Sequence, residues 1–113
     1  MPPVWFRLLL ALSLWTSALA QGVPAPVISE FLASNSGGQR DEDGDSPDWI
    51  EIHNPGATPV NLGGWFLTDA TNQLNRWRFP ERSLSPDGRL LVFASGKNRT
   101  NAAAQLHANF ALS

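Results

Sequence analysis

Closely spaced turn signals constrain this chain more than any other feature of its sequence. Asn54-Pro55-Gly56, Gly63-Gly64 and Ser85-Pro86-Asp87-Gly88 are all sequences that end regular secondary structure. The chain has nine Gly and nine Pro among its 113 residues, so positions that favour turns recur along much of its length. The segments between them are too short for long helices, so the sequence predicts a single domain built from short strands.

The segments between the turns have the apolar or alternating pattern of β-strands. We expect strands at 27–33, 49–53, 60–62, 65–68, 76–79 and 90–94. Segment 90–94 is mostly apolar and predicts a central strand buried on both faces, whereas 101–106 is the one place for a short helical turn. The expected core residues are Ile28, Ile50, Ile52, Leu67, Phe79, Val92 and Phe93. The pattern predicts an all-β sandwich or barrel.

The first twenty residues have the pattern of a secretory signal peptide. Arg7 is the only charged residue among them, an apolar run follows it, and Ala18-Leu19-Ala20 forms a small-residue cleavage site. An N-terminal membrane anchor or a buried first helix are the alternatives, but the run is short for a bilayer core about 30 Å thick. We expect cleavage after Ala20, a lead-in at 21–26 and a mature domain at 27–113 with no membrane span.

Composition excludes several classes of function. The formal net charge of −2 rules out a strongly basic nucleic-acid binder, and 42% hydrophobic residues are too many for a disordered tail. Without cysteine the chain has no disulfides, thiolate zinc sites or cysteine nucleophile. An exported chain of this kind fits a bacterial envelope protein better than a small animal secreted domain. No catalytic motif is visible, so we expect no enzyme activity in these residues.

An acidic segment is the one place where the sequence suggests binding chemistry. It holds five carboxylates within residues 41–48. The expected calcium ligands are Asp41, Asp43, Asp45 and Asp48. Calcium prefers several oxygen ligands from one short turn, and extracellular sites can be weak. The match to a calcium-binding helix–loop–helix is incomplete, because glycine comes at the fourth position and Ile52 at the twelfth. A solvated acidic turn is the alternative, and calcium is the only cofactor considered.

Aromatic and histidine residues offer weaker candidates for a binding site. Trp49, Trp65 and Trp77 could form a stacking platform for a sugar or peptide, but each lies in a strand-like segment and is better explained as core or rim. His53 and His107 have no second ligand or nucleophile nearby in the sequence. Exposed or capping roles are therefore expected for both histidines.

Several ordered stretches together resemble one known family. They are 27–31 with 33–35, 48–55, 60–69, 77–80 and 91–96. In this order and spacing they are similar to the lamin tail domain of exported bacterial proteins. The resemblance implies an immunoglobulin-like β-sandwich that acts as a non-catalytic accessory binding domain of a larger secreted or cell-surface protein.

The resemblance also bears on partners and on the end of the chain. It implies a protein or polysaccharide partner at the cell surface and no specific nucleic acid. The family pattern normally continues beyond residues such as 109–113, so we expect the C-terminal strands to be missing, which would leave an unpaired sheet edge. The alternative function is the N-terminal accessory piece of an exported enzyme whose catalytic domain lies beyond Ser113.

Overall fold

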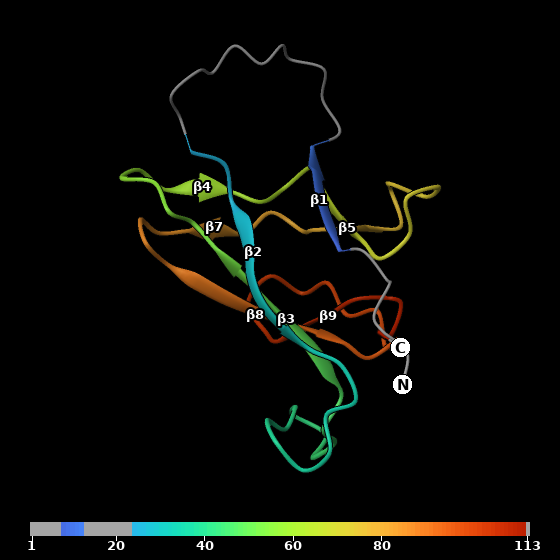
Figure 1. The fold of residues 1–113 in the computed structure, drawn as a ribbon. Helices are drawn as coiled ribbons and strands as arrows, with labels where there is room; N and C mark the ends of the chain where they lie inside the picture. Colours follow the sequence, from blue (N-terminus) through green and yellow to red (C-terminus); the bar gives the residue numbers. More distant parts are fainter. Residues whose placement is uncertain (1–7, 13–23, 113) are drawn as a thin grey trace.

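The computed structural model describes residues 8–12 and 24–112, and every regular element among them is a β-strand (Figure 1). The strands are β1 (Leu9–Leu12), β2 (Val27–Leu32), β3 (Asp48–His53), β4 (Val60–Asn61), β5 (Trp65–Thr68), β6 (Trp77–Arg78), β7 (Ser83–Leu84), β8 (Arg89–Ala94) and β9 (Leu106–His107). All six expected strands are present. β7 and β9 are additional two-residue strands in segments that the sequence pattern does not mark.

β1 lies within the segment predicted to be a signal peptide. The remainder of that segment, including its predicted cleavage site at Ala20, lies almost entirely outside the described residues, as does the first half of the lead-in at 21–26. None of the described residues belongs to a helix with the length and hydrophobicity of a membrane span.

The strands form sheets that pack against one another. The largest has the order β2-β3-β8-β9, and the others have the orders β1-β5-β6 and β4-β7. β3 and β8 run antiparallel with Ile50 opposite Val92, while β9 joins β8 in parallel. One hydrophobic cluster includes Ile52 of β3, Leu67 of β5 and Leu84 of β7. Because these residues come from all three sheets, the sheets face each other as a sandwich around one core.

The core agrees closely with the sequence prediction. Six of the seven expected residues are buried, and they are Ile50, Ile52, Leu67, Phe79, Val92 and Phe93. The prediction is wrong in part for Ile28, which is only half-buried because β2 is an edge strand. Within β8, Val92 faces the main core whereas Phe93 stacks on His107 with ring centroids 5.2 Å apart. The expected central strand is therefore buried on both faces.

Turn chemistry connects the sheets. Asn54 is buried, and its side-chain amide donates to the carbonyl oxygens of Thr58, Leu84 and Ser85 at 2.9–3.1 Å. These hydrogen bonds tie the turn after β3 to the end of β7. Gly64 has φ of +89°, which glycine adopts without a Cβ penalty, and so allows the reversal before β5.

Residues 101–106, the one place for a short helical turn, hold a single tight turn and no helix. The Ala104 N–H donates to the Asn101 carbonyl at 3.0 Å, which closes a tight turn, and Leu106 then begins β9. Leu106 and His107 pair in parallel with β8, so they cannot extend this turn into a helix.

Candidate functional site

The acidic segment between β2 and β3 is folded around the carboxylate of Asp41. One oxygen of this side chain, Oδ1, accepts the backbone N–H groups of Asp43 and Asp45, each at 2.9 Å. The Asp41 N–H in turn donates to the Asp45 carbonyl at 2.8 Å, and Gly44 at φ of +82° lets the chain turn back. The Asp41 side chain is fully buried. The acidic segment is therefore a closed, hydrogen-bonded loop.

A lysine from the connection between β8 and β9 lies among the loop carboxylates. Lys97 Nζ is 2.6 Å from Asp41 Oδ2 and 2.9 Å from the Oδ2 atoms of both Asp43 and Asp45. Hydrogen bonds to Asp41, then to Asp45 and Asp43, raise the pKa of the Lys97 ammonium. Burial alone would raise the pKa of Asp41, but hydrogen bonds from Lys97 and the loop backbone lower it overall. The chain thus supplies a cation to its own acidic loop.

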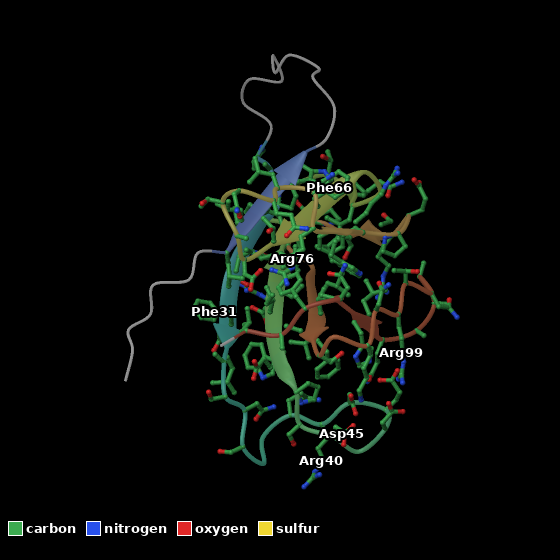
Figure 2. The ribbon with its side chains drawn as sticks, turned by 90° about the vertical axis from the view of Figure 1, so that its right-hand side faces the viewer. Phe31, Arg40, Asp45, Phe66, Arg76 and Arg99 are labelled. Atoms are coloured by element: carbon green, nitrogen blue, oxygen red, sulfur yellow. The ribbon has the colours of Figure 1, made fainter. Side chains whose placement is uncertain are left out.

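Arg99 adds a second positive charge to this cluster. Its Nη1 is 2.8 Å from Glu42 Oε2, and its Nη2 is 2.8 Å from Asp43 Oδ2. The hydrogen bonds from Arg99 and from Lys97 lower the pKa of Asp43 to about 2. We call Asp41, Glu42, Asp43, Asp45, Lys97, Arg99 and His107 the acidic-loop network. Figure 2 shows Asp45 and Arg99 on this side of the molecule.

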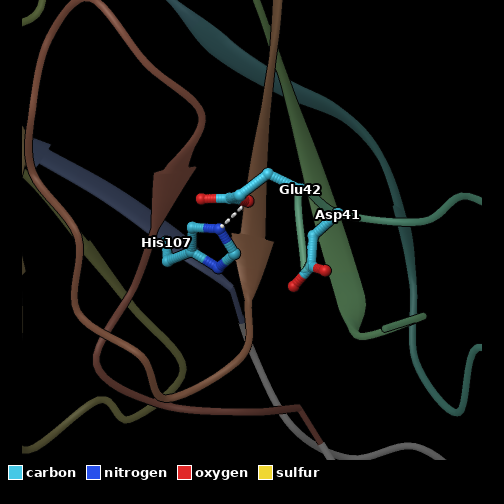
Figure 3. A group of neighbouring side chains, drawn as sticks. All are labelled: Asp41, Glu42 and His107. Atoms are coloured by element: carbon cyan, nitrogen blue, oxygen red, sulfur yellow. Dashed lines mark hydrogen bonds and ion pairs between the residues drawn. The ribbon is translucent and has the colours of Figure 1, made fainter. Parts of the chain in front are cut away.

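His107 joins the network to the sheet. Its Nε2 is 2.7 Å from Glu42 Oε1 (Figure 3), and its Nδ1 is 2.7 Å from Ser95 Oγ. Since an ionised carboxylate can only accept, His107 donates to Glu42 through Nε2 and accepts from the Ser95 hydroxyl. The hydrogen bond from His107 lowers the pKa of Glu42. The sequence does not indicate these contacts, because Glu42 and His107 are 65 residues apart. The exposed or capping role expected for His107 is wrong, since its side chain is fully buried.

Serine, histidine and carboxylate in hydrogen-bonded order is also the arrangement of a hydrolase triad. Here the imidazole is fully buried, and Ser95 Oγ also accepts the Lys97 N–H at 3.1 Å. The two described surface depressions lie elsewhere, one beside Leu8 and β2 and the other around Phe79. The chain of hydrogen bonds therefore fastens the acidic loop to β8 and β9.

The structure places three of the four predicted calcium ligands together. Carboxylate oxygens of Asp41, Asp43 and Asp45 lie within 4.8 Å of one another. Asp48 is not in this group. It begins β3, and its Oδ1 accepts the Asn35 N–H at 3.3 Å. Atoms of Asp41, Glu42 and His107 form a second group within the same distance, one that the sequence did not indicate.

The three tryptophans do not form a platform. Trp77 is buried in the core, where its Nε1 donates to Asn98 Oδ1 at 3.1 Å. Trp49 and Trp65 are half-buried and lie in different sheets, on β3 and β5. The core-and-rim interpretation is therefore correct. His53 lies near the surface and contacts Asp87 Oδ1 through Nε2 at 2.8 Å.

Strand β2 carries three partly exposed apolar side chains, which the sequence pattern does not mark. Val27, Phe31 and Leu32 are 44%, 45% and 39% exposed, and we call them the β2 apolar edge. Figure 2 shows Phe31 projecting away from the body of the sandwich. A groove of about 490 Å³ runs beside this strand and is lined by Leu8, Ile28, Ser29, Glu30 and Phe31. Val27 and Leu32 stand at opposite ends of β2, and the register places Phe31 on the face of Ile50 and Leu32 on the face of Trp49, so a partner would contact the strand along its length.

Comparison with known proteins gives one match. The family model for the Lamin Tail Domain matches residues 20–113. Neither the curated proteins nor the solved structures include a match to the chain.

Proposed function

The chain belongs to the lamin tail domain family, and from this we propose that it is an exported interaction module at the cell surface, an accessory domain of a larger protein. The family is one of non-catalytic immunoglobulin-like domains, in keeping with the sandwich described above. Export is supported by the signal-peptide pattern of residues 1–20. The partner is a protein or polysaccharide of the cell surface.

The β2 apolar edge is the observation that carries the interaction role. Fully burying a large apolar side chain contributes about 1.5–3 kcal/mol. Val27, Phe31 and Leu32 are 39–45% exposed, so a partner that covers them would gain part of this free energy from each. β2 is an edge strand, which leaves this surface accessible along its length. A partner of mixed polar and apolar character fits, because Ser29 and Glu30 lie between the apolar residues.

The test is binding of the fluorescently labelled chain to cells of the organism that produces it. Phe31→Ser should weaken retention by about tenfold or more, which corresponds to about 1.4 kcal/mol. Leu74→Ser is the matched control, since Leu74 is 50% exposed but lies in the loop between β5 and β6. Equal binding by the chain and both variants would overturn the proposed surface. Treating the cells with protease or glycosidase beforehand distinguishes a protein partner from a polysaccharide.

Calcium binding is a second candidate function, favoured by the grouped oxygens of Asp41, Asp43 and Asp45. We propose that calcium enters by displacing the Lys97 ammonium, which contacts all three carboxylates. Competition with this tethered cation would keep the affinity low, near the ~10⁻⁴–10⁻³ M of weak extracellular sites. Asp48 is not part of the proposed ligand set.

The test is thermal unfolding in millimolar calcium compared with excess chelator. Calcium should raise the midpoint of the parent chain slightly, because a ligand that binds only the folded state stabilises it. The rise should be larger in Lys97→Met, which removes the competing ammonium, and absent in the Asp43→Asn, Asp45→Asn variant. An unchanged midpoint in both the parent and Lys97→Met would reject calcium binding by the loop.

A further inference from the structure

Strand β1 covers one edge of β5. The two strands lie side by side (Figure 1) and pair antiparallel, with Leu10 opposite Leu67 and Ala11 opposite Phe66. Leu8 and Leu10 also pack against the hydrophobic core. β1 therefore contributes both backbone hydrogen bonds and apolar contact to the sandwich.

The same residues form the apolar run of the predicted signal peptide. A chain cleaved after Ala20 loses β1, since a segment cannot be both removed and part of the sheet. Its loss would leave the backbone groups on that side of β5 unpaired. It would also make Leu67 and Thr68 accessible to a partner, since β1 covers them and both are 0% exposed in the structure. Unpaired strand edges of this kind are templates for pairing with another chain.

Contacts that do not involve β1 would keep the backbone of β5 extended after β1 is lost. On its other side, β5 pairs with β6, and the Phe79 N–H donates to the Trp65 carbonyl at 2.9 Å. Thr68 Oγ1 hydrogen-bonds within the following loop, donating toward the carbonyls of Ala70 and Gln73. The edge is thus preorganised, and preorganisation lowers the free-energy cost of binding.

We propose that, in the processed chain, the β1-facing edge of β5 is an acceptor site for an extended apolar segment of a partner protein. This inference rests on the proposed export. The partner segment adds as an antiparallel strand, with a large aliphatic side chain opposite Leu67, because Leu10 occupies that position here and packs against the core. Main-chain hydrogen bonds give affinity in such strand addition, and the alternating side chains give specificity.

The test uses the full chain, folded with residues 1–20 in place and a specific protease site substituted within 13–20. After the chain has been cut, a fluorescent peptide with the sequence of residues 7–14 is added and its anisotropy is measured. The matched control peptide carries Leu10→Asp, which places a carboxylate against Leu67. The split chain should take up the first peptide saturably and the control at least tenfold more weakly. The uncut chain, whose β1 is tethered, should take up neither.

Equal binding of both peptides, or no binding of either, would overturn the acceptor site. Dimerisation of the split chain that peptide does not reverse would show instead that a second copy takes the edge, which also overturns it. The mass of the exported chain tests export separately. A chain retaining Met1 would reject the proposed export, whereas peptide exchange on the split chain would still establish the acceptor site.

Discussion

At the scale of single residues, the buried carboxylate of Asp41 organises the acidic loop. Its two oxygens accept two backbone N–H groups and the Lys97 ammonium. A short segment rich in carboxylates would otherwise be pushed open by repulsion between its charges. Lys97 and Arg99, from the connection between β8 and β9, offset that repulsion by direct contact with the carboxylates. The loop therefore stabilises the fold through its charges and holds three carboxylates at fixed positions.

This network predicts sensitivity to acid. Folding lowers the pKa of Asp43 from 3.8 to about 2, mainly through Arg99, and lowers that of Glu42 below 4.5, mainly through His107. A carboxylate whose pKa falls on folding stabilises the fold fully above its ordinary pKa, and this stabilisation is lost as the pH drops toward the lowered value. The thermal midpoint should therefore be nearly constant from pH 7 to about pH 5 and fall between about pH 4.5 and 2.

Circular dichroism melts across this range, recorded with Asp43→Asn as the control, test that expectation. The variant should start from a lower midpoint and lose less of it in acid, because it has one fewer carboxylate to protonate. A midpoint in the parent chain that is unchanged between pH 5 and pH 2 would contradict the stabilising role of the network.

At the scale of elements, the strands that carry a hydrophobic pattern are the ones the sequence predicts. β3 and β8 are examples, because Ile50 and Ile52 alternate toward the core and 90–94 is nearly all apolar. β7 and β9 lie in segments without an apolar or alternating pattern, and they are held by pairing with β4 and β8. Their existence depends on contacts between distant segments, which local sequence does not encode.

The candidate site was predictable to the same limited degree. Carboxylate density locates the acidic loop, and alternate spacing identifies Asp41, Asp43 and Asp45 as neighbours. Lys97 is 56 residues from Asp41, and no local pattern marks it as the partner. Asp48 is the opposite case. It lies beside the carboxylate cluster in the sequence, but in the structure it begins β3 and does not join the cluster.

The packing of β6 gives a stability prediction at this scale. Phe79, immediately after β6, is 1% exposed and contacts Trp77 edge-on, with ring centroids 5.0 Å apart. Phe79→Ala should lower the free energy of unfolding by about 3–5 kcal/mol, since it removes a large buried side chain and leaves a cavity. Arg78→Ala, at the exposed neighbouring position, should change it by less than about 0.5 kcal/mol. Urea unfolding measures both, and a similar loss in the two variants would contradict the assigned alternation.

At the scale of the whole molecule, a single sandwich presents two different edges. β2 offers an exposed apolar surface, and β5 is covered by residues that the signal pattern assigns for removal. The acidic loop joins β2 to β3, and the ion pairs made by Lys97 and Arg99 tie it to the connection between β8 and β9. We propose that the strand edges of this charge-stabilised domain are its interaction surfaces, and that removal of residues 1–20 opens the edge of β5.

The intact mass of the chain recovered from the medium or cell envelope of a secreting host tests this account most directly. Cleavage after Ala20 predicts a protein that begins at Gln21 and contains neither Arg7 nor β1. A membrane-bound product that retains Met1 would contradict it, because β1 would then remain in place on β5 and the chain would not be the exported module proposed here.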